Sequence, residues 1–377
     1  MVLNLLGPES LKERLLLQVE EAACKNLRLW SSQPSVELKE ATAEMIFDLT
    51  ANNLISYDPT KSTENLRENF VAFIQGLISF PINIPVPNSV LTMFVQGRKK
   101  AMKMLKNMLQ ERLASPEKQY RDFFDYVVEE LKKEKPILTE PIALDLMFVL
   151  LFASFETTSL AITLAIKFLT DHPSVLVKLT VSNSTFPEIV FYPVFIQWSI
   201  TPSLYQEEHE TIRRSRDAIH SGITWKENKS MTFTSLVINE TVRLANIVPG
   251  IFRKALQDVQ INEYMIPKGW VVMVCPPAVH LNPEIYQDLL ALNPSRWDGR
   301  ITEQGLESNG RSKHFMAFGW GMRFCVGTDF TKLQMAILLH CLVSKYRWTA
   351  IRGGNIVRTP GLSFPNGYHI QLFEKLP

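Results

Sequence analysis

Cysteine is scarce in this chain. Four cysteines occur among 377 residues, at Cys24, Cys275, Cys325 and Cys341, and no two of them form a CxxC pair. This spacing argues against a disulfide framework and against a zinc ribbon. It suits a protein of a reducing compartment.

An excess of charge of either sign is also absent. The chain has 40 Lys and Arg against 38 Asp and Glu, for a formal net charge of +2, so composition gives no case for nucleic-acid binding. A hydrophobic content of 46% with 21% charged residues is typical of a folded globular protein. We treat residues 1–377 as a single domain.

No signal or transit peptide is visible at the start of the chain. The opening MVLNLLGPESLKERLLLQVEEA has a short apolar run that Pro8 and Glu9 soon interrupt. The long apolar segment is 144–169, which by itself resembles a transmembrane span. Glu156 and Thr157 lie at its centre, where a carboxylate in lipid would be costly. We therefore predict a soluble protein with a long helix through its core.

Helical periodicity dominates the rest of the chain. Apolar residues recur at helical spacing from Leu11 onward and again in 37–55. Residues 97–113 form a basic amphipathic pattern that could contact a membrane or an acidic partner, but a solvated helix face is the favoured interpretation because the charge is ordinary for a surface helix. Further predicted helices span 229–246 and 329–348.

Strand patterns are few. Residues 250–280 alternate and carry β-branched side chains, which predicts strands and turns. Residues 361–372 suggest a hairpin around Pro365, Asn366 and Gly367. The predicted fold class is mainly α with a minor β-sheet.

The loop FMAFGWGMRFCVG, residues 315–327, places one cysteine among aromatic residues and glycines. A metal-ligating thiolate needs hydrogen-bond donors near its sulfur, and glycines let backbone N–H groups approach. A helix beginning near Gly327 would add its positive dipole end. The alternative is that Cys325 is a buried structural cysteine without a ligand. A chance match of the chain to the five-residue pattern given next is on the order of one in ten thousand, which favours the functional interpretation. The pattern F-x-x-G-x-R-x-C-x-G is met by Phe318, Gly321, Arg323, Cys325 and Gly327.

This loop resembles the haem-binding signature of the cytochrome P-450 family, the haem-thiolate monooxygenases. The resemblance implies the cytochrome P-450 fold and a haem b whose iron is ligated by the Cys325 thiolate. Phe318 would pack beside the sulfur, and Arg323 offers a fork suited to a haem propionate. The segment PGIFR makes Arg253 a second propionate candidate.

Two further segments resemble motifs of the same family. In ETVR, Glu240 and Arg243 share one helix face, and NPSRW supplies Arg296. By resemblance these three residues form a buried structural network that holds the meander before the cysteine loop.

The segment ASFETT is similar to the family's oxygen-activation motif. We assign Glu156 and Thr157 to proton delivery into an apolar pocket and Ala153 to the groove over the haem. The alternative is that Thr157 merely bonds back to its own helix.

The resemblance covers nearly the whole chain and is strongest to plant members that oxidise steroids and triterpenoids. It implies insertion of one oxygen atom of O2 into a C–H bond of a sterol-like or triterpenoid substrate. Electrons would come from an NADPH–cytochrome P-450 reductase, on the cytosolic face of the endoplasmic reticulum membrane. The implied ligands are an apolar small molecule and O2, with no nucleic acid.

Three departures from the family pattern keep a second interpretation open. The start corresponds to the family's third or fourth helix, so we expect the N-terminal anchor, first helices and most of the first sheet to be missing, which leaves a cytosolic location open. Residues 181–206 match no family feature. We interpret them as a retained intron, because valine codons begin with GT and glutamine can be CAG, or as a genuine surface insertion. Trp320 stands where the family usually has glycine.

These departures favour the alternative of an inactive or haem-binding-only remnant. A membrane-associated binding protein built on 144–169 and 186–204 is a third possibility, which the acid–threonine pair and the charged flanks disfavour.

Overall fold

The computed structural model describes most of the chain. The described residues are 8–60, 65–77, 90–115, 122–180, 208–209, 212, 222–298, 314–358 and 361–375. The predicted insertion at 181–206 therefore lies outside the described residues.

Helices make up most of the described chain, as predicted. In chain order they are α2 (Pro8–Ser10), the π-helical η1 (Leu11–Leu15), α3 (Leu16–Ser31), α4 (Leu38–Ile55), α5 (Leu66–Leu77), α6 (Val90–Ala114), α7 (Phe123–Leu131), α8 (Glu140–Asp171), α9 (Pro173–Thr180), α11 (Trp225–Ser230), α12 (Thr232–Ala245), α13 (Pro276–His280), the 3₁₀ turns η2 (Pro294–Trp297) and η3 (Gly321–Arg323), and α14 (Thr328–Lys345).

The strands form small antiparallel sheets. They are β1 (Val36–Glu37), β2 (Ile251–Lys254), β3 (Val259–Ile261), β4 (Tyr264–Ile266), β5 (Val271–Val274), β6 (Tyr346–Gly353), β7 (Val357–Arg358), β8 (Leu362–Ser363) and β9 (Tyr368–Glu374). One sheet has the order β1-β9-β6, and the pairs β2-β5, β3-β4 and β7-β8 are two-stranded. The predicted class, mainly α with a minor β-sheet, is confirmed.

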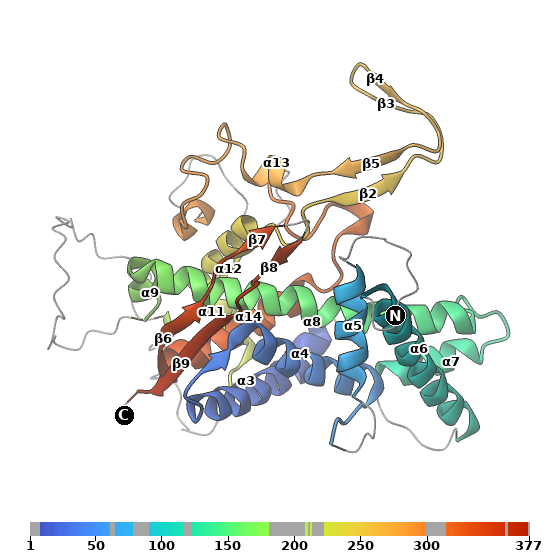
Figure 1. Cartoon of the computed structure of the whole chain (residues 1–377), viewed down its shortest axis with the longest axis horizontal. Helices are drawn as coiled ribbons and strands as arrows, with labels where there is room; N and C mark the ends of the chain where they lie inside the picture. The colour runs from blue at the N-terminus through green and yellow to red at the C-terminus, as the bar shows by residue number, and fades with distance from the viewer. Residues whose placement is uncertain are drawn as a thin grey trace, which may run out of the picture.

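Helix α8 is the centre of the molecule (Figure 1), where it packs against α4, α12 and α14. Its side chains are apolar on nearly every face, which is the pattern of a helix surrounded by protein. Among the described residues it is the one helix long and apolar enough to span a membrane, yet 61% of its most apolar window is buried inside the molecule. The prediction of a core helix therefore agrees with the fold.

The basic segment 97–113 lies within α6. Ala101, Leu105 and Leu109 are buried, as their spacing predicts. The helix is tied down at its end by Arg112, whose guanidinium reaches the carboxylate of Asp122 at 2.5 Å. Its apolar face is thus occupied by the core, and the membrane interpretation is not needed.

The hairpin predicted around Pro365 and Asn366 is wrong. A turn is present, since the Gly367 N–H donates to the Phe364 carbonyl at 2.9 Å. The strands on its two sides, however, pair elsewhere: β8 with β7, and β9 with both β1 and β6. The eight-residue β6 offers β9 a longer partner than the two-residue β8 does, and local turn chemistry did not decide the pairing.

Strands β2 to β5 extend away from the helical body (Figure 1). This arm carries large apolar side chains in contact with solvent, including Phe252 at 65% and Trp270 at 64% exposure. Exposed apolar side chains of this kind favour association with other apolar surfaces.

Candidate functional site

The cysteine loop is shaped by glycines. Gly319 and Gly321 have φ of +78° and +67°, a left-handed conformation that residues with a Cβ rarely adopt. Trp320 lies between them with φ −151° and ψ 155°, which is extended backbone open to any residue. Its side chain points partly into solvent. An indole at this position therefore imposes no strain on the backbone.

Cys325 lies in the last stretch of this loop, just before α14. Its N–H donates to the Phe318 carbonyl at 2.9 Å, so the loop closes on itself. Its own carbonyl accepts from the Thr328 hydroxyl at 2.8 Å, which links it to the first turn of the helix. The thiol is left exposed, in front of a helix N-terminus that favours a negative sulfur.

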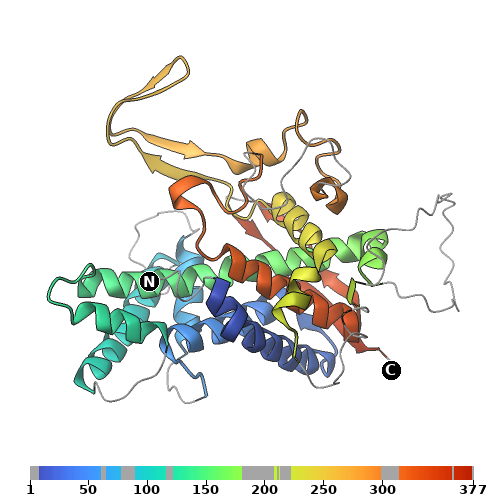
Figure 2. The ribbon, with the colours of Figure 1, turned by 180° about the vertical axis from the view of Figure 1, so that it is seen from behind.

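The middle of α8 lies beside the start of α14. The hydroxyls of Thr158 and Thr331 are 3.2 Å apart, which joins the two helices six residues after Cys325. Figure 2 shows the loop before α14 rising next to α8. The acid–threonine motif and the cysteine loop, which are distant in sequence, thus belong to one region.

One face of α8 is bare in this region, although the helix is otherwise buried. Val149 is 53% exposed and Ala153 is also exposed. Thr157 is one turn further along the same face, and its hydroxyl donates to the Ala153 carbonyl at 3.0 Å. This is the back-bond of the alternative interpretation, but it uses only the hydroxyl proton and leaves the oxygen lone pairs open.

Glu156 points to a different neighbour. Its carboxylate is 2.8 Å from the ammonium of Lys39, at the start of α4. Both side chains are partly exposed. The structure therefore brings Glu156 next to a cation rather than to the Thr157 hydroxyl.

Glu240 organises the predicted structural network and is fully buried. Arg243 donates to both of its oxygens, at 2.8 and 2.9 Å. Arg296 donates to it at 2.8 Å, the Trp297 indole N–H at 2.9 Å, and the Asn293 backbone N–H at 3.1 Å. The structure thus brings Glu240, Arg243 and Arg296 together around one carboxylate.

The two arginines also hold backbone carbonyls of the meander. Arg243 donates to the carbonyls of His280 and Leu289, at 2.8 and 2.9 Å. Arg296 donates to the Gln287 carbonyl at 3.1 Å. The network therefore fixes the path of the chain between α13 and η2.

His280 connects this network to the cysteine loop, and sequence reasoning missed it. The Met316 N–H donates to Nε2 at 2.9 Å, so Nδ1 carries the proton and donates to the Asn246 amide oxygen at 2.7 Å. Burial and the nearby Arg243 lower the pKa of His280 to about 4, which keeps it neutral. A single histidine after an apolar strand gives no sequence signal for this role.

Tyr286 is a second residue that the sequence did not reveal. Its hydroxyl donates to the His314 carbonyl at 2.5 Å, near the start of the described part of the loop. Its ring lies against the Arg243 guanidinium, 4.8 Å from the centroid.

The two propionate candidates are both exposed. Arg253 lies on β2 and donates to the Phe252 carbonyl at 2.8 Å. Arg323 ends η3 and has no ion pair with any residue that the structure describes. Neither guanidinium is committed to a carboxylate of the described chain.

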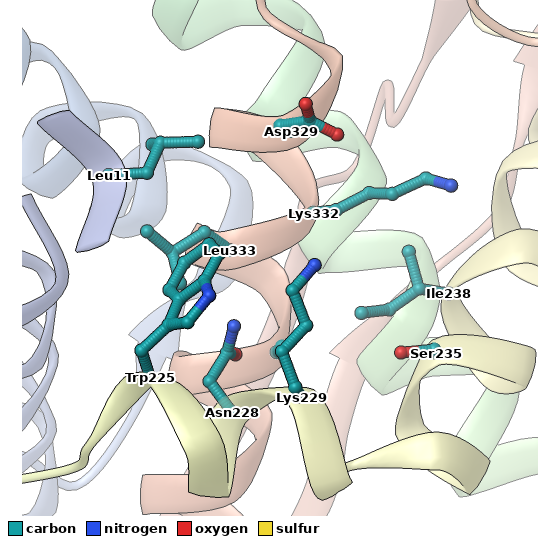
Figure 3. A pocket seen from close by; sticks show the side chains of 10 residues that line it. Leu11, Trp225, Asn228, Lys229, Ser235, Ile238, Asp329, Lys332 and Leu333 are labelled. Atoms are coloured by element: carbon teal, nitrogen blue, oxygen red, sulfur yellow. The ribbon is translucent and has the colours of Figure 1, made fainter. Parts of the chain in front are cut away.

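A cavity of about 170 Å³ adjoins α14 on the side of the cysteine loop. Figure 3 shows Lys229 of α11 and Lys332 of α14 extending over the same opening, beside Trp225. The ammonium of Lys332 is 5.7 Å from the centre of the Phe318 ring, and burial lowers the pKa of Lys332.

The exposed groups fit a haem. One free thiol, one uncovered apolar helix face and uncommitted arginines are what a thiolate-ligated porphyrin with propionates requires. No cluster of three or more His, Cys, Asp or Glu suited to a metal ion occurs among the described residues, and a haem iron held by a single protein ligand needs none.

Comparison with known proteins gives matches over nearly the whole chain. A sequence model described as "Cytochrome P450" matches residues 6–181 and 190–367. The gap at 182–189 lies within the predicted insertion, but the match resumes at 190, so the extent of that insertion stays a prediction.

Curated relatives and solved structures agree with this match. "Cytochrome P450 87A3" of Oryza sativa subsp. japonica is 58% identical, over 100% of this chain and 67% of its own length. "Beta-amyrin 16-alpha-hydroxylase CYP87D16" of Maesa lanceolata is 37% identical, over 99% of this chain and 71% of its own.

Among solved structures, "Retinoic acid bound cyanobacterial CYP120A1" superposes with a TM-score of 0.78 at 22% identity, covering 99% of this chain and 77% of that one. This likeness shows that the described fold is that of the family. The chain belongs to the cytochrome P450 family, whose members are oxidoreductases that incorporate molecular oxygen into their substrates.

Proposed function

We propose that this monooxygenase binds haem b through the Cys325 thiolate and inserts one oxygen atom of O2 into a C–H bond of a triterpenoid or sterol-like molecule. The observation that carries the proposal is the exposed Cys325 thiol, held at the start of α14 by a loop that closes on the Phe318 carbonyl. When bound, the haem supplies an iron that activates dioxygen.

The chain's own residues would define the environment of that iron. The N-terminal end of α14 favours the anionic sulfur of Cys325. Arg323 and Arg253 are free to pair with the propionates, since each is exposed and neither is held by a carboxylate of the described chain. Phe318 would limit access of water to the sulfur from the side of Lys332.

Proton delivery is assigned to Glu156 and Thr157. The Thr157 hydroxyl lies on the bare face of α8, and its proton is engaged with the Ala153 carbonyl. It can therefore accept a hydrogen bond from water and pass a proton on by exchange. Glu156, paired with Lys39 near the surface, would take up protons from solvent and hand them to water near Thr157.

The substrate class is supported by the bare apolar face of α8 and by the relatives. Val149 and Ala153 present aliphatic surface, which suits a hydrocarbon skeleton. The Maesa relative is named for hydroxylation of beta-amyrin, a compound of this chemistry. The carbon attacked is left open.

Electrons would come from an NADPH-dependent flavoprotein reductase on the cytosolic face of the endoplasmic reticulum membrane. Lys229 of α11 supports this, because it is exposed and places positive charge beside the cavity that adjoins the first turns of α14. Positive charge there attracts an acidic partner surface and speeds its association.

The spectrum of the reduced, carbon monoxide-bound protein tests the proposal. We expect a red-shifted Soret band in the unaltered protein and its loss in Cys325→Ser, because a hydroxyl does not replace the thiolate as a donor to iron. Cys275→Ser is the matched control, since Cys275 lies on another element, just before α13, and should leave the band unchanged. A thiolate spectrum that persists in Cys325→Ser would refute the assignment.

A further inference from the structure

Two of the four cysteines meet inside the helical body, although 317 positions separate them. The sulfurs of Cys24, on α3, and Cys341, on α14, are 3.7 Å apart. They come together because α3 and α14 pack directly against each other. Neither residue belongs to the cysteine loop or to the face of α8 described above.

We propose that Cys24 and Cys341 are a redox-responsive thiol pair, which a peroxide converts to a disulfide that cross-links α3 to α14. A disulfide has an S–S length near 2.05 Å, so the sulfurs must approach by about 1.7 Å. Both thiols are free in the structure, which is the reduced state expected of a reducing compartment.

The two sulfurs differ in access and in charge, as such a pair requires. Cys24 is half-buried and Cys341 is buried, so an oxidant in solvent meets Cys24 first. The hydrogen bond with the Cys341 thiol lowers the pKa of Cys24 to about 6. Lys345 and Arg28 also lower it, while burial and Glu20 oppose them. The same hydrogen bond and burial raise the pKa of Cys341.

This division of roles matches the chemistry of disulfide formation. A thiolate is the nucleophile, so Cys24 attacks one oxygen of hydrogen peroxide, breaks the O–O bond and becomes a sulfenic acid, while the other oxygen leaves as hydroxide and takes up a proton to form water. Cys341 then loses its proton and attacks the sulfenic sulfur, which releases a second water. Two thiols are oxidised by two electrons in all, and one peroxide is reduced to two waters.

The cross-link would constrain the helix that follows the cysteine loop. It joins positions 24 and 341, and closing so long a loop restricts the unfolded chain strongly. The expected result is a rise in unfolding temperature of about 5 °C on oxidation. A dithiol reductant would reverse it.

The pair is tested by peptide mapping of the purified full chain after exposure to hydrogen peroxide. We expect a peptide linked through Cys24 and Cys341, which dithiothreitol removes. Mapping separates this product from oxidation of the exposed Cys325. A chain whose peptides stay unlinked, or whose Cys24 forms sulfonic acid while Cys341 stays a thiol, would overturn the proposal.

Variants separate the two roles. In Cys341→Ala the Cys24 sulfenic acid has no partner, so it should accumulate and be captured by dimedone. In Cys24→Ser the remaining Cys341 should not react, and Cys275→Ser should form the cross-link as the unaltered chain does. Where a variant fails to fold, the linked peptide of the unaltered chain still decides. None of these readouts depends on haem or on activity.

Discussion

At the scale of single residues, the buried carboxylate of Glu240 is the group on which the structural network depends. One buried carboxylate accepts from two guanidinium groups, an indole and a backbone N–H. Removing one member of a buried ionic network leaves the remaining charges buried and unpaired. The stability lost in this way exceeds the net stability that the intact network contributes.

We therefore expect Glu240→Gln to lower the free energy of unfolding by about 3–5 kcal/mol and to lower haem retention. The change keeps the shape of the side chain and removes its charge. Asp171→Asn is the matched control, because its pair with Lys167 is solvent-exposed on one side and should cost no more than about 0.5 kcal/mol. Urea unfolding of both variants checks this, and equal losses would contradict it.

A second residue-scale prediction concerns pH. The folded-state pKa of His280 is about 4, below its usual 6.5, so the unfolded chain binds this proton more readily. The stability that the neutral ring provides is complete above pH 6.5 and is lost as pH falls toward 4.

Unfolding measured from pH 7 to pH 4 should show this loss, which is at most about 3 kcal/mol for His280. Glutamine does not titrate, so in His280→Gln the free energy of unfolding should depend less steeply on pH. The stability of this variant at pH 7 should nevertheless be lower. A slope unchanged in His280→Gln would contradict the assignment.

At the scale of elements, the region around 181–206 shows helical order on both sides. Helix α9 ends at Thr180 with Leu179 buried, and His209 and Ile212 are each 4% exposed. Glu208 caps α12 by accepting from the N–H groups of Phe233 and Thr234 at 2.6 and 3.2 Å. Core contacts are therefore present on both sides of 181–206.

Deleting 181–206, which joins Thr180 to Glu207, should therefore leave the protein folded and at least as resistant to urea. The shorter connection lowers the entropy cost of closing this part of the chain and allows helical hydrogen bonds across the junction. A Gly-Ser linker of equal length is the control and should match the unaltered chain. An insoluble deletion variant would contradict the prediction, and transcript sequencing would show whether the shorter form exists.

At the scale of elements, the sequence predicted the helices of the core but not the pairing of the strands. The helices of the core were predictable because apolar spacing decides them, and α8, α12 and α14 were all expected. The pairing of β9 with β1 and β6 was not, since strand partners are chosen by contacts between distant segments. The hydrogen bonds of His280 and Tyr286 could not be predicted for the same reason, because their partners are distant in the sequence.

At the scale of the whole molecule, the arm formed by β2 to β5 gathers many of the exposed large apolar side chains that the structure describes. Phe252, Trp270 and Leu256 are exposed there, and contiguous apolar surface promotes association.

The chain should self-associate as its concentration rises. Phe252→Ser combined with Trp270→Ser should shift light-scattering mass toward the monomer, because it removes two of the largest exposed aromatic groups of the arm. Tyr126→Ser is the control, since Tyr126 is similarly exposed on α7 but lies off the arm. A monomer at every concentration, or an equal effect of both changes, would contradict the prediction.

The sequence by itself determined the helical class, the core helix α8 and the loop around Cys325, because these depend on residue spacing and on local backbone geometry. Only the tertiary structure decided that Glu156 meets Lys39, that His280 joins the network to the loop, and that Cys24 and Cys341 touch. The reason is physical: such contacts form where packed helices cross, and their crossing points depend on every side chain between them.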